Sequence, residues 1–494
     1  MQTQTTTTTR GAAFAGFGRL LTILALLTAG AAQANNIAVT NVKWVAGTEV
    51  ESSVKFDLAW DNSWRAEWSE TAGNNVTDAE LPVENWDAAW VFVKFRQIGN
   101  DGYAHATLST NAADHAMPAG ATNTVGLTDG KGVGVFIYRN APGNGANAFT
   151  SVQLRWLHAS NGVVETNTVD LQVHAIEMVY VGPGAFNAGS GGGEVSAFTS
   201  TVIITNDATV AGGYPTGPGT LTGTYATWPN GYNAFYCMKY EITQGQYADF
   251  LNALSSDDAS ARFPNQYGNY RHTITNVGIV YSATRPDRAC NYISWWDGAV
   301  YAEWSGLRPM TELEFEKACR GPRKPLINEY AWGTAEIMSS AKTLSGAEDG
   351  TETNSIDQSA GAAHYANVTI SGGDGGSGPL RVGIFAKLGS ARSASGASYW
   401  GIMELSGNLW ERPVTIGTAD GRNFQGTHGA GTLIPPANWP QSGVSGAGFR
   451  GGNWITASVY ARASDRGSAA IVHAARYGLN GGRAVRSAPS GVGP

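Results

Sequence analysis

The stretch NYISWWDGAVYAEWSGLRPMTELEFEKACRG at residues 291–321 combines two helix signals with an arginine-containing turn. Thr311 and Glu314 have the Thr-x-x-Glu spacing of a capping box, which predicts a helix that begins after Thr311 and stops at Gly321. A shorter helix is predicted over residues 295–304 (WWDGAVYAEW). Helices of this length indicate a domain in which regular elements form only a small framework.

The segments on either side extend this interpretation. Residues 243–254 (TQGQYADFLNAL) predict a further helix, with Thr243 as its N-cap and Tyr247 and Phe250 on one face. After Gly321 the sequence is mostly loop with short motifs between. We therefore expect long ordered loops that are held in place by aromatic side chains.

The part of the chain between residues 35 and 172 alternates apolar and polar residues with the period of a β-strand. The apolar positions are Val54, Phe56, Leu58 and Trp60, followed by runs at 90–95, 133–138 and 152–156. Short strands at this spacing predict a β-sandwich over residues 35–172. His105 and His115 are predicted to lie on its surface. The pairs Trp60/Trp64 and Trp86/Trp90 fit a carbohydrate platform or, as we favour, a packed β core.

Composition excludes some classes of partner. The formal net charge is −7, and the only cluster of basic residues is the short GPRKP at 321–325. Because phosphate binding needs concentrated positive charge, no nucleic-acid partner is expected. Cys237, Cys290 and Cys319 are odd in number, so at most one disulfide forms within the chain and at least one thiol is left over.

The N-terminus has the pattern of a signal peptide over residues 1–34. Arg10 and Arg19 precede the apolar run LTILALLT, and Ala32-Gln33-Ala34 fits the small-x-small cleavage rule. The apolar run is too short to span a bilayer. The sequence therefore predicts a secreted or cell-surface protein with no integral membrane segment.

Six motifs, in order over about residues 176–489, resemble the formylglycine-generating enzyme or sulfatase-modifying factor family. They are MVYVGPGAF (178–186), FYCMKYEITQGQYADFLNAL (235–254), the 291–321 stretch, YAWG (330–333), GIMELSGNLWER (401–412) and FRGGNW (449–454). The resemblance implies a C-type-lectin-like fold for residues 173–494. The expected fold class is thus α+β: an N-terminal β-sandwich followed by a loop-rich, C-type-lectin-like sulfatase-modifying factor domain.

The resemblance also implies what has been lost. The family's oxidase converts a substrate cysteine to formylglycine with copper held by two cysteines just after the Arg-Gly-Gly-Ser-Phe/Trp motif. Here Thr456 and Ala461 occupy the matching positions, and no cysteine follows Cys319. Because thiolates are the soft ligands that copper(I) requires, oxidase activity is not expected and no catalytic residue is predicted.

A second branch of the superfamily uses non-haem iron held by histidines, usually from an attached helical bundle. The eight histidines of this chain are scattered, and none forms an i, i+4 pair. A facial triad built across loops remains open. A metal-dependent oxidoreductase of this superfamily is therefore the alternative function.

Calcium is the cofactor that the resemblance implies, as a structural ion. The family's Gly-Asn-x-Trp-Glu motif contributes ligands, and Asn408, Leu409 (through its backbone) and Glu411 match it. Carboxylate, amide and carbonyl oxygens are what calcium prefers. The alternative, that Asn408 and Glu411 cap local backbone in a tight turn, is equally open. The loop around Asn367 and Val368 matches the family's second calcium site more loosely.

Other residues of the motifs are expected to be structural. The tryptophans at family positions are predicted core residues: Trp295, Trp304, Trp332, Trp410 and Trp454. Arg308, Arg450, Arg466 and Glu314 are predicted to form a buried polar framework that ties loops together.

The segment at about 448–488 alternates a recurring framework (FRGGNW, ARASDR, AAR, GGRAVR) with chemically mixed inserts. The inserts, which we predict to form a ligand-binding surface, are Ile455, Thr456, Ser458, Val459, Tyr460, Ser468, Ile471, Val472, His473, Tyr477, Leu479 and Asn480. Aromatic, hydroxyl and small residues on a rigid scaffold are typical of an adaptable binding site. The arrangement resembles the variable proteins of diversity-generating retroelements.

The sequence therefore predicts an exported ligand-binding or adhesion protein with a protein or glycan partner. Tyr460, His473 and Tyr477 are expected near the centre of its binding surface. A structural component of the cell envelope is a third possibility that the Gly-, Asn- and Thr-rich composition permits.

Overall fold

The computed structural model describes residues 4–8, 37–70, 80–164, 166–198, 202–204, 207, 228–367, 369–387, 389–443 and 445–489. Its centre is a 12-stranded sheet. The strands of this sheet are β1 (Gln4–Thr8), β2 (Ala38–Val45), β3 (Ser52–Glu70), β4 (Leu81–Gln97), β5 (Ala104–His105), β6 (Ala121–Thr128), β7 (Lys131–Arg139), β8 (Gly143–Trp156), β9 (Val169–Val181), β12 (Phe235–Met238), β15 (Arg308–Pro309) and β18 (Ala484–Ser487).

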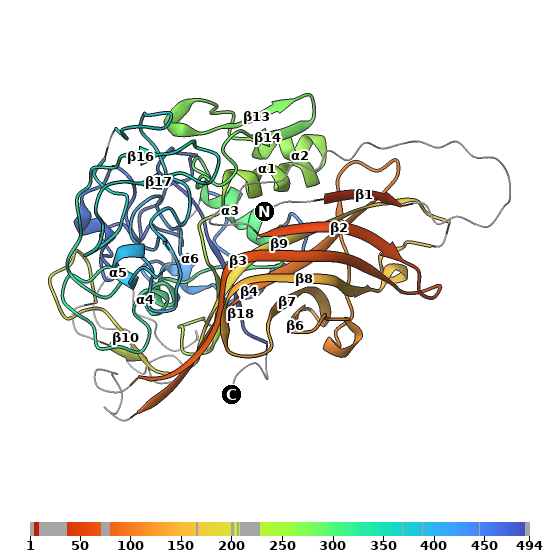
Figure 1. Ribbon diagram of the computed structural model, residues 1–494, viewed down its shortest axis with the longest axis horizontal. Coiled ribbons are helices and arrows are strands. Elements are labelled where there is room, and N and C mark those ends of the chain that lie inside the picture. The colour runs from red at the N-terminus through yellow and green to blue at the C-terminus, as the bar shows by residue number, and fades with distance from the viewer. Residues whose placement is uncertain are drawn as a thin grey trace.

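The sheet joins the two ends of the chain. Its main order is β15-β18-β12-β9-β4-β3-β2, while β8 pairs with β3, β7 with β4 and β6 with β7. Figure 1 shows the long N-terminal strands reaching away from a loop-rich half. Three two-stranded sheets lie outside it: β10 (Phe186–Ala188) with β11 (Val202–Ile204), β13 (Ile274–Val277) with β14 (Val280–Ala283), and β16 (Leu344–Ser345) with β17 (Thr353–Asn354).

The three predicted helices are confirmed: α1 (Gln244–Ala253), α3 (Trp295–Trp304) and α4 (Glu312–Arg320). Each begins with a capping box, in which the side chain at N3 reaches back to the N-cap backbone. The other helices are short: α2 (Ser256–Arg262), α5 (Arg392–Ser395), α6 (Ala419–Arg422) and the 3₁₀ turns η1 (Ala112–Asp114), η2 (His158–Asn161), η3 (Asn269–Arg271) and η4 (Ser458–Ala461). Strands and few helices together give a mixed α+β protein.

Strands β4 and β9 are buried on both faces, and every residue of β9 is buried. One face, with Val93 and Val173, packs in a core built with β2, β3 and β8. The opposite face, with Trp90, Phe92 and Met178, packs on α1 and α3. These two strands are therefore a wall shared by the N-terminal strands and the helices.

This wall corrects the predicted domain boundary between residues 172 and 173, which falls inside β9. The strand pairs with β4 along residues 169–179 and with β12 along residues 178–181. A strand covered on both faces loses the alternation that marks a half-buried strand. The change of pattern in the sequence therefore marks the centre of a sheet and not the edge of a domain.

A buried polar cluster lies where the N-terminal core meets the rest of the sheet. Lys239 Nζ lies 3.0 Å from Glu177 Oε2 and 3.3 Å from Asp87 Oδ2. Asp87 also accepts hydrogen bonds from Trp60 Nε1 at 3.0 Å and from Ser63 Oγ at 2.6 Å. These bonds tie β3, β4 and β9 to the residue that follows β12.

The predicted surface positions of the two N-terminal histidines are wrong. His115 is 4% exposed, and Arg155 N donates to its Nδ1 at 3.1 Å. His105 is half-buried: its ring stacks on Phe92, with ring centroids 5.8 Å apart, and its Nε2 lies 2.6 Å from Val133 O. Both rings satisfy local backbone groups, a use that the spacing of the two residues does not reveal.

For the tryptophan pairs, the core alternative is confirmed at three positions. Trp60, Trp86 and Trp90 are each at most 1% exposed, so they offer no platform to a ligand. Trp64 is half-buried, and its Nε1 donates to Asn85 Oδ1 at 2.6 Å.

Cys237, Cys290 and Cys319 are all buried and free. Of the predicted signal peptide, only Gln4–Thr8 is described, as β1 paired with β9. The apolar run and the cleavage motif lie outside the described residues. Within the described part of the chain, no helix has the length and apolar character needed to cross a membrane.

Candidate functional site

The C-terminal segment rests on one side of α4. Glu312 and Glu316 are four residues apart, so they project from the same side of the helix. Arg450 bridges them, with Nη1 3.0 Å from Glu312 Oε2 and Nη2 2.8 Å from Glu316 Oε1. Arg466 Nε lies 2.7 Å from Glu312 Oε2. All four side chains are at most 2% exposed, so the ion pairs are shielded from water.

Glu312 is the centre of this network because every oxygen it presents has donors. Its Oε1 accepts from Thr415 Oγ1 and Ile416 N, both at 2.8 Å, and from Arg466 Nη2 at 2.9 Å. Burial acts to raise the pKa of Glu312, but the ion pairs with Arg466 and Arg450 outweigh it and lower the pKa to about 2. The carboxylate is therefore ionised at neutral pH.

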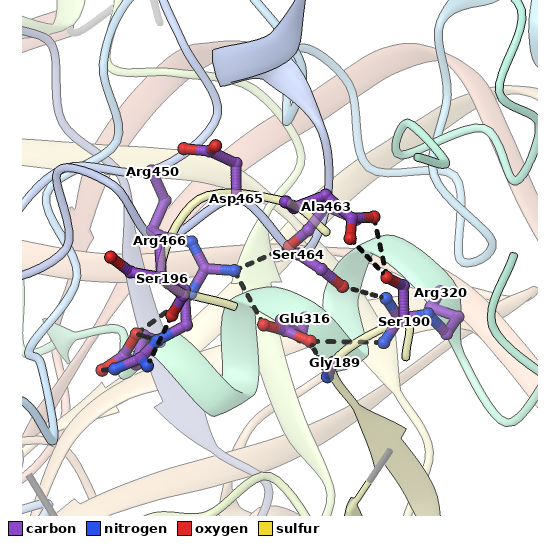
Figure 2. Close-up of polar contacts among 12 residues, drawn as sticks. Gly189, Ser190, Ser196, Glu316, Arg320, Arg450, Ala463, Ser464, Asp465 and Arg466 are labelled. Carbon is purple, nitrogen blue, oxygen red and sulfur yellow. Dashed lines mark hydrogen bonds and ion pairs between the residues drawn. The ribbon is translucent and has the colours of Figure 1, made fainter. Parts of the chain in front are cut away.

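The same network continues along α4 to its C-terminal end, as Figure 2 shows. Glu316 Oε2 accepts from Gly189 N at 2.6 Å. Arg320 donates to Ser464 Oγ at 2.8 Å and forms a buried ion pair with Glu329. One helix face thereby fixes two loops, one before it in the chain and one after it.

The predicted polar framework is confirmed. Arg450 and Arg466 form the ion pairs described above, and Arg308 donates to both oxygens of Glu314 at 2.8 and 2.6 Å. The acidic partners Glu312 and Glu316 were not predicted. The i, i+4 spacing of the two glutamates on a capped helix can be read from the sequence. Their pairing with Arg450 and Arg466 cannot, because these arginines lie more than 130 residues further along the chain.

The inserts lie above this framework, and most of them reach the surface. Six are exposed: Ile455, Val459, Tyr460, Ile471, Val472 and Tyr477. Five are half-buried: Thr456, Ser458, Ser468, His473 and Leu479. Framework residues from the same segment, such as Trp454 and Ala463, are at most 2% exposed. Exposed inserts therefore alternate with a buried scaffold.

Asn480 is the exception among the predicted surface residues, because it is 2% exposed. Its backbone N donates to Tyr477 O at 3.0 Å, and it forms a β-bridge with Trp410. Asn480 therefore belongs to the buried framework of the segment. Its predicted place on the ligand-binding surface is wrong.

Aromatic rings connect the three residues that were predicted at the centre of the surface. Tyr460 lies 6.2 Å from Trp410, which lies 5.7 Å from Phe449, between ring centroids. Phe449 in turn lies 6.0 Å from His473, and His473 lies 5.9 Å from Tyr477. Trp410 and Phe449 are buried, so they form a floor from which the other three rings emerge.

Arg412 holds this floor in position. Its guanidinium carbon lies 4.2 Å from the centroid of Phe449, and its Nη2 donates to His473 O at 3.1 Å. Burial lowers the pKa of Arg412 to about 9. Its bonds to loop carbonyls give the loop around His473 a fixed path.

Thr456 and Ala461, at the positions predicted to match the copper ligands of the family's oxidase, have different surroundings. Thr456 is half-buried, and its hydroxyl accepts from Asn453 N at 2.9 Å. Ala461 is 1% exposed, and its carbonyl accepts from Ser406 Oγ at 2.7 Å. Neither residue offers a thiolate.

The three cysteines of the chain lie elsewhere, in β12, before α3 and in α4, and all are buried. Burial raises the pKa of Cys237 to about 12 and also raises the pKa values of Cys290 and Cys319. They are therefore protonated, inaccessible thiols near neutral pH.

The predicted calcium ligands are engaged with protein groups. Asn408 Nδ2 and Leu409 N both donate to Glu241, the latter at 2.9 Å, and Asn408 Oδ1 accepts from Leu380 N at 2.9 Å. Asn408 has φ of 64°, in the left-handed region that asparagine tolerates. The partners of Asn408 lie 28 and 167 residues away in the sequence, so its side chain links distant segments and does not cap the local turn of the alternative prediction.

Glu411 faces a cation of the protein itself, because its Oε1 accepts from Arg483 Nε at 2.7 Å. At the looser site, Asn367 Oδ1 accepts from Thr369 N at 3.1 Å, and Val368 lies outside the described residues. Among the residues that the structure describes, no group of three or more His, Cys, Asp or Glu could hold a metal. As arranged, these residues do not fit a calcium site, and calcium binding stays a prediction.

Three buried carboxyls, those of Glu241, Glu404 and Glu411, surround Arg483. Burial raises the pKa values of all three, and to about 7 for Glu404. Glu404 Oε1 accepts from Gly383 N at 2.7 Å, whereas its Oε2 has no hydrogen-bond partner within the described ranges. Glu404 therefore carries a proton over part of the range below neutral pH. Its role was not predicted from the sequence.

Comparison with known proteins agrees with this architecture. Residues 164–488 match the family described as the sulfatase-modifying factor enzyme 1-like domain. The chain is similar to the formylglycine-generating enzyme of Bos taurus, with 23% identity over 215 residues, 36% of this chain and 48% of that enzyme. The corresponding enzyme of Thermomonospora curvata is 27% identical over 176 residues, again 36% of this chain and 48% of that enzyme.

A hercynine oxygenase of Mycobacterium tuberculosis is also similar, with 27% identity over 128 residues, 23% of this chain and 30% of that protein. The chain spans about half the length, or less, of these curated relatives.

The buried ion pairs can be tested by Arg450→Ala. The change leaves Glu316 without its Arg450 partner and removes one of two arginines from Glu312, so the free energy of unfolding should fall by about 3–5 kcal/mol. Urea denaturation followed by tryptophan fluorescence measures it. The matched control is Arg323→Ala: the Arg323 side chain is 51% exposed, so its pair with Glu70 should contribute less than about 1 kcal/mol. Equal losses in the two variants would contradict the role of the buried network.

The protonation of Glu404 predicts a pH effect. Its pKa is about 7 in the folded protein against an ordinary value of 4.5, so the folded state holds a proton that the unfolded chain releases between these values. The stability that this group contributes is therefore present below about pH 4.5 and is lost as pH rises to about 7. Glu404→Gln should gain stability relative to the unmodified chain by about 1–3 kcal/mol between pH 5 and pH 8.

Urea unfolding at both pH values measures that difference, and Glu336→Gln, at an exposed position, controls for the substitution itself. A Glu404→Gln effect that is the same at pH 5 and pH 8 would show that this carboxyl does not titrate in the window.

Proposed function

The chain belongs to the sulfatase-modifying factor enzyme 1-like domain family, and we propose that it uses this domain to bind a ligand and not to oxidise one. The finer description that goes with this proposal is a C-type-lectin-like domain that is attached to N-terminal β-strands and exported to the cell surface or beyond. The chemistry of the C-terminal segment supports it, and the activities named for its relatives are those proteins' own.

The argument against oxidation rests on ligand chemistry. A copper(I) site of the family's kind needs two thiolates near each other. Thr456 and Ala461 at the matching positions provide a hydroxyl and a methyl group. The remaining thiols are buried and have raised pKa values, so they cannot substitute without unfolding.

The observation that carries the proposal is the separation of exposed inserts from buried framework. Exposed side chains that take no part in the buried ion pairs can change at little cost in stability. Tyrosines with large contact areas and few rotamers are efficient in such a surface. Tyr460 and Tyr477 are 36% and 54% exposed, and each extends from the row of packed rings.

The composition of the surface favours a protein partner, with a glycan as the second choice. Ile455, Val459, Ile471 and Val472 add aliphatic area beside the rings, each between 37% and 51% exposed. Exposed aliphatic groups gathered on one segment mark protein interfaces, whereas sugars stack mainly on aromatic faces. Diversification of these inserts belongs to the proposal, because the buried framework would tolerate it.

The binding surface is tested by the combined substitution of Tyr460, His473 and Tyr477 by alanine. The melting temperature should change little, because substitutions at the surface usually cost within about 0.5 kcal/mol each. Binding to ligands found on a printed glycan array and an array of extracellular protein domains should be abolished. Trp454→Ala is the structural control: its side chain is 2% exposed, and its loss should cost about 3–5 kcal/mol.

Two results would contradict the binding surface. If the triple variant unfolds like Trp454→Ala, the three residues are part of the core. If it keeps every ligand of the unmodified chain, the ligand binds elsewhere.

The absence of oxidase activity is tested directly. The purified chain is incubated with copper, oxygen and a sulfatase-type cysteine peptide, and the mass of the peptide is followed. No conversion to formylglycine above a protein-free control is expected, because Thr456 and Ala461 cannot supply thiolates. Conversion that depends on the protein would overturn this part of the proposal.

A further inference from the structure

A polar cleft of about 500 Å³ opens next to the C-terminal segment. Its walls come from η3 and the residues after it, from the turn after β14 and from the loop at residues 374–377. Tyr270 on its rim joins it to the framework of the C-terminal segment: its ring lies 5.3 Å from that of Trp454, and a Cβ at Gly478 would lie 2.4 Å from its Cδ2. The cleft is thus a separate site at the edge of the proposed binding surface.

Arginines dominate the cleft. Arg271 and Arg288 are 6% and 3% exposed, and both pair with Glu348. Arg288 Nη2 also lies 2.9 Å from Asp374 Oδ2. Arg285 is half-buried and donates from Nη1 to the carbonyl of the preceding residue, at 3.0 Å. Three guanidiniums are therefore gathered at this cleft.

Some donors in this cleft lack an acceptor. Arg271 Nη1 and Arg285 Nε are buried and have no hydrogen-bond partner among the residues that the structure describes. A buried donor without an acceptor destabilises the folded state. Burial, and then the neighbouring Arg288, lower the pKa of Arg271 to about 10, so its charge is poorly compensated. An added anion would relieve both penalties.

His272 adds an acceptor to the same wall. Asn291 Nδ2 donates to Tyr270 O at 2.8 Å, which directs Asn291 Oδ1 to the Nδ1 of His272, also at 2.8 Å. Nδ1 therefore carries the proton. Nε2 belongs to a ring that is 0% exposed, has no partner in the described part of the chain and is left as an acceptor. Burial lowers the pKa of His272 to about 4, so the ring is neutral. A hydroxyl donor of a ligand would complement it.

We propose that this cleft binds a small hydroxylated oxyanion, of the class of a sugar acid. The guanidiniums of Arg271 and Arg285 recognise the anionic group, and His272 accepts from a hydroxyl. The volume exceeds that of a bare inorganic anion and matches a small ligand. Tyr267 and Tyr270, 60% and 49% exposed at the rim, provide aromatic faces for the sugar ring.

The test uses the whole purified chain and D-glucuronate as the probe, with ionic strength held constant by sodium chloride. The melting temperature should rise with glucuronate in a saturable way, because a ligand that binds only the folded state stabilises it. Sulfate should give a smaller saturable rise, because it lacks the hydroxyls, and neutral glucose should give none. Calorimetric titration then gives the dissociation constant of glucuronate.

Arg285→Gln is the deciding variant because Arg271 and Arg288 form the buried ion pairs of the cleft, so a change at the half-buried Arg285 should disturb the fold least. The dissociation constant of glucuronate should rise about tenfold or more. Arg422→Gln is the matched control: Arg422 is also half-buried, donates to a backbone carbonyl (Ile416 O, 2.8 Å) and lies outside the cleft. It should keep the affinity of the unmodified chain.

The proposal is overturned if glucuronate gives no saturable rise, if glucose gives the same rise, or if Arg285→Gln binds glucuronate as tightly as Arg422→Gln does. The test is independent of the proposed ligand surface. The variant with alanine at Tyr460, His473 and Tyr477 should bind glucuronate unchanged, so failure of one proposal leaves the other standing.

Discussion

The ion pairs of Glu312 with Arg450 and Arg466 are the interaction on which the loop-rich half depends. Taking such charges out of water costs several kcal/mol for each ion unless every polar atom finds a partner. Glu312 meets this condition through two arginines, a hydroxyl and a backbone amide. Long loops have few repeating hydrogen bonds of their own, so they need directional contacts to adopt one path. Glu312 and Glu316, one turn apart on α4, provide these directional contacts to loop segments that are far away in the sequence.

The second constraint is the doubly covered wall of β4 and β9. Because one face supports the N-terminal core and the other supports α1 and α3, neither half can be packed without the other. Lys239, paired with Glu177 and Asp87, fixes the register where the cores meet. A buried cation with two carboxylates tolerates little displacement, since moving one partner leaves an uncompensated charge. The N-terminal strands are thus part of the scaffold that positions the C-terminal segment.

Local signals explain what the sequence could predict. Capping boxes at Thr243 and Thr311 act within three residues, so both helices were predicted within a residue or so of their observed ends. The framework and inserts of the C-terminal segment were also separable by residue type. Contacts over long distances were not predictable: the acidic partners of Arg450, the burial of His115 and the pairing of β9 depend on segments brought together only by folding. Asn480 was misplaced because a polar residue beside exposed inserts gives no sign that it is buried.

The buried framework also holds in place the loop that carries Thr456 and Ala461. Position 461 is enclosed: Ala461 is 1% exposed, and its carbonyl is held by Ser406. Its backbone keeps its place through that bond and through the packing of Gly452, where a Cβ would approach Ala461 N to 3.1 Å. The loop is therefore held by backbone contacts and by Arg450, which donates to Ala463 O. Because the loop is held by its backbone and by buried residues, its outward side chains are not needed for the stability of the fold. They can therefore serve a binding surface.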